Sequence, residues 1–227
     1  MKLIIPVIDL KNGIVVHAKQ GQREQYQPIK SVLTPNSDIY SVLHGFLNLY
    51  AFDTFYIADL NAITGQGNNA ALIYQVLNNF SDITFWIDAG YQQAKIFPEN
   101  YFPVLGSECF NDENICELLD FKQRFMLSLD YGITGEMLGA KKLFTETEFW
   151  SENVIVMTLN RVGSSQGVNV DLLQQFKQNY PQKKFIAAGG VRDMADIQKL
   201  KSIAIKHVLL ASALHSGAIT KMDISQF

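Results

Sequence analysis

Aspartates stand directly after several short apolar runs of this chain. Asp9 follows LIIPVI and Asp130 follows FMLSL, and Asp59 and Asp88 end two similar runs between them. Two carboxyl groups on opposite faces of a small substrate can serve as general base and general acid. The alternative is that each aspartate only caps the loop that follows it. We take Asp9 and Asp130 as the candidate acid–base pair.

Thr158 ends another apolar run and is the third candidate catalytic residue. Its hydroxyl can orient a carboxylate or bind the substrate, although a β-branched residue is also an ordinary choice for a strand. The four histidines lack metal-ligand spacing, and Cys109 and Cys116 suit neither a zinc site nor a redox pair. No nucleophile motif stands out. The spacing of these residues therefore predicts no metal site.

A glycine pair marks the candidate phosphate site. The stretch FIAAGGVRDMADI, residues 185–197, is typical of a buried strand, a glycine turn and the start of a helix. Adjacent glycines let the backbone approach a ligand closely, and the free N–H groups of a helix start favour an anion. The alternative is an ordinary strand-to-helix turn. The candidate phosphate-binding residues are Gly189, Gly190, Val191, Ala211 and Ser212.

The same plan recurs in the first half of the chain. The offset that joins Gly90 to Gly190 also joins QGNN, residues 66–69, to QGVN, residues 166–169. Such repetition indicates duplication of a half-barrel, with halves of about 1–120 and 121–227 in one domain of residues 1–227. The counterpart in the first half is a secondary candidate site formed by Asp88, Gly90, Gly106 and Ser107.

Eight apolar runs supply the elements that must position these residues. Continuous apolar runs are typical of parallel strands covered on both faces. The predicted strands are Leu3–Ile8, Thr54–Ile57, Thr84–Ile87, Phe102–Leu105, Phe125–Leu129, Val154–Met157, Phe185–Ala188 and His207–Leu210. The predicted helices are Ser37–Ala51, Asn68–Phe80, Glu113–Leu119, Val170–Tyr180 and Met194–Leu200. Eight alternating strands predict an α/β fold, a (β/α)8 barrel with catalytic residues at the carboxyl ends of its strands.

Two segments depart from strict alternation. Ile14–Ala18 is predicted to form a hairpin with the first strand, and Tyr91–Asn100, which contains Pro98, is predicted to lack a full helix.

Composition limits the possible partners. The chain has 227 residues, is 48% hydrophobic and carries a net charge of −3, with its basic residues scattered. No basic cluster favours nucleic acid or a membrane surface, and no run predicts a signal peptide or a membrane span. We expect a cytoplasmic protein whose partner is a small phosphorylated metabolite.

Four motifs resemble the ProFAR isomerase family of histidine biosynthesis and its cyclase sister. They are IIPVIDLKNGIVV, ADLNAITGQGNN, SLDYG and IAAGGVRDMADIQKL, and the resemblance spans nearly the whole chain. It implies a half-barrel duplication, two opposed phosphate sites and an Amadori rearrangement of an aminoaldose phosphate to an aminoketose. By position, Asp9 would be the general base and Asp130 the general acid. The acid opens the ribose ring, and the base moves the C2 proton of the resulting Schiff base. No metal or organic cofactor is implied.

Departures from the family pattern leave the substrate open. Asp88-Ala89-Gly90-Tyr91 replaces several glycines and an arginine, Ala211-Ser212 replaces Gly-Arg, and Leu159 follows Thr158 where the family has aspartate. The stretch MTLNRVGSSQG resembles a divergent branch known from methanogens and methylotrophs. Histidine biosynthesis and the synthesis of a one-carbon carrier cofactor both remain open, as do a lyase or cyclase and a catalytically silent ligand-binding barrel.

The changed glycines also predict how many phosphates the ligand carries. A carboxylate at Asp88 repels an anion, and fewer glycines block close backbone approach. We therefore expect one phosphate, held by the second half of the chain.

Overall fold

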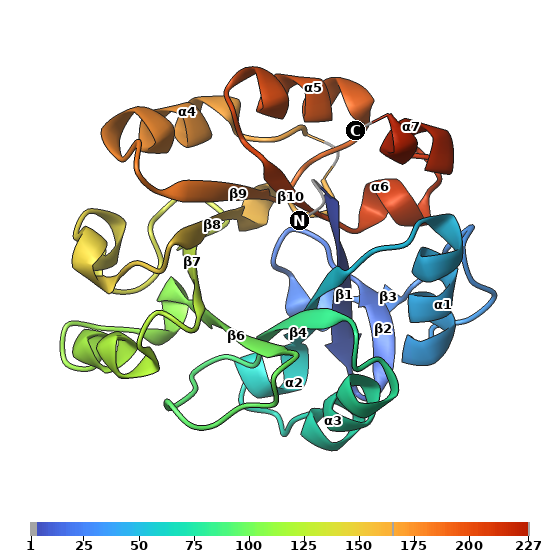
Figure 1. Cartoon of the computed structure of the whole chain (residues 1–227), viewed down its shortest axis with the longest axis horizontal. Helices are drawn as coiled ribbons and strands as arrows, with labels where there is room; N and C mark the ends of the chain where they lie inside the picture. Colours follow the sequence, from blue (N-terminus) through green and yellow to red (C-terminus); the bar gives the residue numbers. More distant parts are fainter. Residues whose placement is uncertain (1–3, 165, 227) are drawn as a thin grey trace.

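The computed structural model describes residues 4–164 and 166–226 of the chain. Leu3, the first residue of the first predicted strand, and one serine of the MTLNRVGSSQG stretch lie outside these ranges. Within them, parallel strands form a closed barrel with helices on its outer side (Figure 1). The barrel strands are β1 (Ile4–Lys11), β4 (Thr54–Asp59), β5 (Thr84–Asp88), β6 (Tyr101–Gly106), β7 (Met126–Tyr131), β8 (Asn153–Thr158), β9 (Lys184–Ala188) and β10 (His207–Leu210).

The barrel closes where its last strand meets its first. β10 pairs with β1 in parallel, with Ile5 opposite Leu209, and each other strand pairs with its sequential neighbour. Two further strands, β2 (Ile14–His17) and β3 (Gln27–Pro28), continue antiparallel from the end of β1. This confirms the (β/α)8 fold and the predicted hairpin. The strand order puts β1 and β7 on opposite sides of the barrel, with three strands between them in either direction.

Two layers of apolar side chains explain why these runs form strands. Every residue of β4 and of β7 is buried, as expected for parallel strands covered on both faces. One set fills the barrel interior and includes Ile5, Tyr56, Trp86 and Ile186. The other set packs between the strands and the outer helices. This double layer holds the carboxyl ends of all the strands in one ring.

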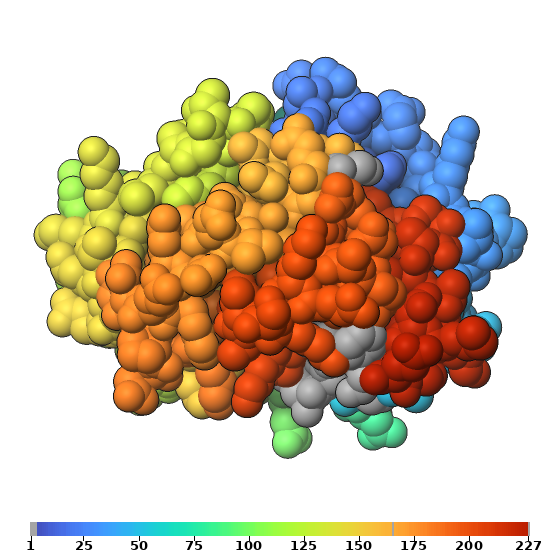
Figure 2. Space-filling model, turned by 90° about the horizontal axis from the view of Figure 1, so that it is seen from above, coloured from blue at the N-terminus to red at the C-terminus, as the bar shows by residue number. Residues whose placement is uncertain are grey.

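The longer helices lie outside the strands. They are α1 (Ile39–Leu49), α3 (Ala70–Asn79), α4 (Val170–Asn179) and α5 (Met194–Ser202). Figure 2 shows α4, α5 and α7 (Lys221–Ser225), in orange to red, covering one side of the molecule. The short helices α2 (Leu60–Ile63) and α6 (Ser212–His215) follow β4 and β10 directly. None of the helices in the described ranges is long and apolar enough to cross a membrane.

The remaining connections are short 3-10 helices rather than α-helices. They are η1 (Arg23–Gln25), η2 (Ser107–Cys109), η3 (Ile115–Phe121), η4 (Lys141–Phe144), η5 (Thr147–Phe149) and η6 (Leu159–Arg161). The predicted helix at Glu113–Leu119 is wrong in type and shifted, because the segment forms η3, whose C-cap residue Lys122 lies in the left-handed region with φ of 49°. The segment between β5 and β6 has no helix, as Pro98 predicted.

The two halves share local features at matching positions. Asn69 and Asn169 are the N-cap residues of α3 and α4, and Gly67 and Gly167 precede them with φ of 90° and 84°. Short helices follow both β4 and β8. These matches accord with duplication, and the division near residue 120 stays a prediction.

Candidate active site

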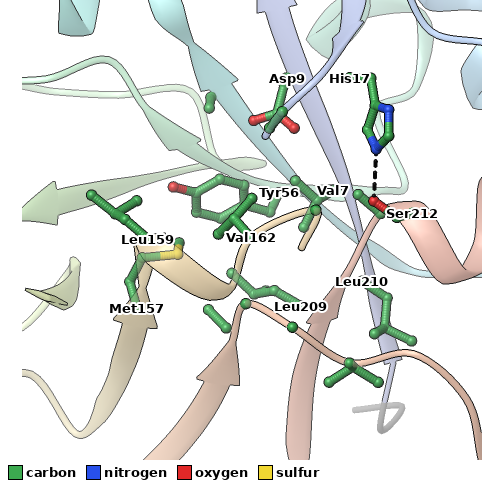
Figure 3. A pocket seen from close by; sticks show the side chains of 18 of the residues that line it. Val7, Asp9, His17, Tyr56, Met157, Leu159, Val162, Leu209, Leu210 and Ser212 are labelled. Carbon is green, nitrogen blue, oxygen red and sulfur yellow. Dashed lines mark hydrogen bonds between the residues drawn. The ribbon is translucent and has the colours of Figure 1, made fainter. Parts of the chain in front are cut away.

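A cavity of about 500 Å³ opens at the carboxyl ends of the strands. Asp9 of β1, Asp88 of β5 and Asp130 of β7 line it together with the turn after β9. Figure 3 shows side chains from several strands around this cavity, among them Asp9, Tyr56 and Met157. The barrel therefore brings the two candidate catalytic aspartates, on facing strands, into one pocket. Both lie inside their strands rather than after them, because β1 continues to Lys11 and β7 to Tyr131.

Asp130 is buried among polar groups on the pocket wall. Its side chain receives hydrogen bonds from the Ser128 hydroxyl to Oδ1 at 2.6 Å, and from the Ser107 hydroxyl and the Glu108 N–H to Oδ2, both at 3.4 Å. The Asp130 pKa is raised to about 8, chiefly by burial and next by the charge of Glu108, while the Ser128 hydrogen bond opposes the rise. Asp130 therefore holds a proton at neutral pH, as a general acid requires.

Asp9 faces the same cavity with a less raised pKa. The Asp9 pKa is raised to about 7, chiefly by burial; the nearby Arg23 charge opposes this rise and the Asp88 charge adds to it. A large fraction of Asp9 is thus ionised near neutrality, as a general base requires. Both carboxyl groups line one pocket, and the pKa of Asp130 is raised further than that of Asp9.

Thr158 is held away from the cavity. It is buried, and its hydroxyl donates a hydrogen bond to the carbonyl of Ala188 at 3.1 Å. A Cβ at Gly189 would lie 2.6 Å from the Thr158 carbonyl oxygen. In the structure Thr158 supports the strand end beside the glycine turn, and its neighbour Met157 lines the pocket instead. A catalytic role for Thr158 stays a prediction.

All five candidate phosphate-binding residues line the pocket. The backbone N–H groups of Gly190 and Val191 have no hydrogen-bond acceptor among the described residues. Gly190 has φ of 87°, and a Cβ there would lie 2.4 Å from the Gly167 carbonyl oxygen. At the start of α6, the Ser212 hydroxyl lies 3.0 Å from His17 Nε2, the dashed contact in Figure 3. The turn thus offers N–H groups to an anion at a place where only glycine fits.

The start of α5 does not contribute to this site as the sequence suggested. The Asp193 carboxylate accepts hydrogen bonds from the N–H groups of Ala195 and Asp196, and the Arg192 N–H donates to Asp196. The Arg192 guanidinium is also paired with Asp196, at 2.8 Å. These side chains take up the N–H groups of Ala195 and Asp196, so the expectation that the helix-start N–H groups are free is wrong for these two.

The secondary candidate residues position carboxylates. The Asp88 side chain accepts hydrogen bonds from the Gly90 N–H at 3.0 Å and from the Tyr56 hydroxyl at 2.9 Å. Burial raises the Asp88 pKa to about 6, and these two hydrogen bonds oppose that rise. Asp88 thus occupies the N–H group that an anion at Gly90 would need.

Gly106 and Ser107 position the Asp130 carboxylate. A Cβ at Gly106 would lie 2.8 Å from Asp130 Oδ2, so the carboxylate packs where a side chain would stand. The backbone N–H of Asp130 donates to the Ser107 hydroxyl at 2.9 Å. Asp88 lines the cavity, whereas Gly90, Gly106 and Ser107 stand behind its wall.

Sequence reasoning missed several pocket residues. His17, Arg23, Tyr56 and Glu108 all line the cavity, and Arg23 forms an ion pair with Glu108 at 2.6 Å. No sequence motif marks these four residues, because they come together only when the chain folds. Ser128 could have been found, since residues two apart in a strand share a face. No group of three or more metal-ligating acidic, histidine or cysteine side chains occurs in the described part of the chain.

The closed barrel and the pocket lined by Asp9 and Asp130 at the carboxyl ends of its strands define a class, the (β/α)8-barrel enzymes. Within it, the chain belongs to the histidine biosynthesis protein family, whose model matches residues 3–220. This confirms the resemblance of the four motifs.

Three relatives cover nearly the full length of both chains. An uncharacterized protein of Methanocaldococcus jannaschii is 31% identical, over 97% of this chain and 96% of its own. Proteins of Cytophaga hutchinsonii and Lactiplantibacillus plantarum are 38% and 27% identical, with at least 98% of each chain covered. These two are named as isomerases of an imidazole-4-carboxamide that carries two phosphoribosyl groups.

Proposed function

We propose that the protein catalyses an Amadori-type aldose–ketose isomerisation of a phosphorylated amino sugar or ribotide. One observation carries this proposal: Asp9 and Asp130 line a single pocket from facing strands, and their pKa values are raised to about 7 and about 8. Two relatives named as isomerases support the same reaction type. The Asp9–Asp130 pair is also retained at the positions that the family resemblance assigns to base and acid.

The proposed reaction moves protons between these two groups. Asp130 gives its proton to the ring oxygen as the C1–O bond breaks, and the lone pair of the glycosidic nitrogen forms the C=N bond of a protonated Schiff base. Asp9 then takes the C2 proton, and the electrons of that bond form C1=C2 as the C=N electrons return to nitrogen. Asp9 returns its proton to C1, and Asp130 accepts the C2 hydroxyl proton as the C2=O bond forms, which gives the aminoketose. The atoms balance, and both groups return to the protonation states in which they began.

We propose that the substrate carries one phosphate, bound by Gly189, Gly190, Val191, Ala211 and Ser212. The N–H groups of Gly190 and Val191, which have no acceptor among the described residues, and the polar Ser212–His17 contact support an anion there. At the opposite end, the Asp88 carboxylate accepts the Gly90 N–H and stands at the pocket wall. At ~4 Å two like charges repel by about 1 kcal/mol in water and several times more near a protein surface. This end therefore favours a neutral or cationic group.

Two further questions are whether the barrel is catalytically active and in which pathway its substrate occurs. Retention of the acid–base pair favours an active isomerase over a silent binding barrel. The loss of glycines near Asp88 favours a substrate other than the two-phosphate ribotide named for the relatives. A precursor of a one-carbon carrier cofactor is one such substrate.

The direct test compares two phosphoribosylamines. The purified protein is incubated with the two-phosphate imidazole carboxamide of the named relatives and with an aryl ribosylamine that carries a single 5-phosphate, and ketose formation is followed. The proposal expects turnover of the single-phosphate compound and its loss in Asp9→Asn and Asp130→Asn. Faster turnover of the two-phosphate compound would overturn the single-phosphate assignment. Absence of turnover with both, together with unaltered phosphate binding, would favour the silent barrel.

A further inference from the structure

An ion pair occupies the end of the pocket opposite the glycine turn. Arg23 Nη2 lies 2.6 Å from Glu108 Oε1, and the two side chains are 27% and 26% exposed. Both residues line the cavity. Arg23 belongs to η1, between β2 and β3, and Glu108 belongs to η2, directly after β6. The pair thus joins two loops at the pocket mouth that lie far apart in the sequence.

The loop that carries Arg23 is fixed by hydrogen bonds of its own. Lys11 Nζ donates to the Arg23 carbonyl at 2.8 Å, and the Gln20 N–H donates to the Val162 carbonyl at 2.7 Å. The Arg23 backbone is therefore anchored beside the cavity independently of Glu108. Its guanidinium stays within reach of a ligand even when its present partner is removed.

Glu108 is also tied to the acid–base chemistry. Its N–H donates to Asp130 Oδ2 at 3.4 Å, and its side chain turns to Arg23. A guanidinium is the preferred partner of phosphate because its parallel N–H groups match two oxygens at once. Here Nη2 of the guanidinium is engaged by a carboxylate oxygen of Glu108, which brings a negative charge of its own.

We propose that Glu108 is the specificity-determining residue of this end of the pocket. It holds the Arg23 guanidinium in an ion pair and so excludes a second phosphate from the ligand. Without its charge, Arg23 becomes an anion-binding group and the pocket accepts phosphates at both ends. This inference rests on the proposed single-phosphate substrate and adds the residue pair that enforces it.

The test is Glu108→Gln, which keeps the size of the side chain and removes its charge. Crystals of wild type and variant are soaked in sulfate, and ribose 5-phosphate and ribulose 1,5-bisphosphate are titrated by calorimetry. In the variant we expect a sulfate ion on the Arg23 guanidinium and affinity for the bisphosphate that rises by about tenfold or more. Affinity for ribose 5-phosphate should change by less than about threefold, because its phosphate lies at the glycine turn.

Two further variants separate the explanations. In Glu108→Gln with Arg23→Gln the gain should disappear, since the latent anion-binding group is gone. Glu152→Gln removes an equal charge from the ion pair with Lys184, just before β8 at the other end of the barrel, and should change neither affinity.

Each outcome bears on a distinct claim. No sulfate on Arg23 in Glu108→Gln, or an unchanged affinity for the bisphosphate, overturns the role of Glu108. A gain that survives in the double variant also overturns it, because repulsion alone would then explain the effect. Absence of sulfate at Gly190 in the wild type would instead overturn the proposed phosphate site, while the result at Arg23 still decides the role of Glu108.

Discussion

Replacing Asp130 by asparagine should stabilise the protein at neutral pH while abolishing its proposed activity. Burial raises the Asp130 pKa from 3.8 to about 8, so the folded protein keeps a proton that the unfolded chain releases. Stability from this group is complete below pH 4 and is lost as pH rises from about 4 to about 8. The asparagine side chain does not titrate in this range, so the Asp130→Asn variant escapes this loss.

The size of the effect follows from the same shift. At pH 7 the aspartate costs about 1.4 kcal/mol for each of the roughly three pH units above 3.8, or about 4 kcal/mol. The asparagine oxygen can still accept from Ser128, but its NH2 group would face the Glu108 N–H, a mismatch worth about 1–3 kcal/mol. The net gain at pH 7 is about 1–3 kcal/mol. At pH 5 the titration contribution falls to about 2 kcal/mol, so the gain nearly vanishes.

Urea denaturation of wild type and variant at pH 5, 6 and 7 measures this difference. The stability of Asp130→Asn relative to wild type should rise by about 3 kcal/mol between pH 5 and pH 7. Asp38→Asn is a suitable control, because Asp38 caps α1 through the Ser41 N–H on the protein surface. A stability difference between wild type and Asp130→Asn that does not change with pH would refute the raised pKa, and with it the role of Asp130 as a protonated acid.

The remaining predictions concern turnover and the phosphate turn. Asp9→Asn should fold and bind ligand but lose roughly 10²–10⁴-fold in kcat, and wild-type rates would contradict its role as base. The pH profile of kcat/KM should be bell-shaped with its maximum between about pH 7 and pH 8, because Asp9 must be ionised and Asp130 protonated; a flat profile across this range would argue against the pair. Gly190→Ala should lower stability by about 1–3 kcal/mol and abolish inorganic phosphate binding, measured by denaturation and calorimetry. Gly135→Ala is its control, since it has the same φ of 87° but open space around it, and it should leave phosphate binding intact.

The architecture could be predicted from local sequence alone. Unbroken apolar runs identify strands that must be covered on both faces, and eight of them alternating with helical patterns leave a closed barrel as the natural arrangement. Pro98 explained the missing helix after β5 in the same local way. Once the barrel is closed, aspartates at strands one and five must face each other. The sequence thus determined the fold and the placement of Asp9 and Asp130 in one pocket, and their acid–base roles stay a prediction.

Only the tertiary structure decided what the other candidates do. Thr158 donates its hydroxyl proton to the Ala188 carbonyl, Gly90 gives its N–H to Asp88, and Asp193 caps α5. Each outcome depends on which partner is nearest in space, and a hydrogen-bonding group bonded within the protein is withdrawn from a ligand.

The Arg23–Glu108 ion pair shows most clearly what could not be predicted from the sequence. Its members are 85 positions apart and come from irregular loops, so neither periodicity nor motif spacing brings them together. Local patterns determine where strands lie because burial acts on each run separately. The charge and hydrogen-bond balance of the pocket is decided by long-range contacts, which exist only after the barrel has closed.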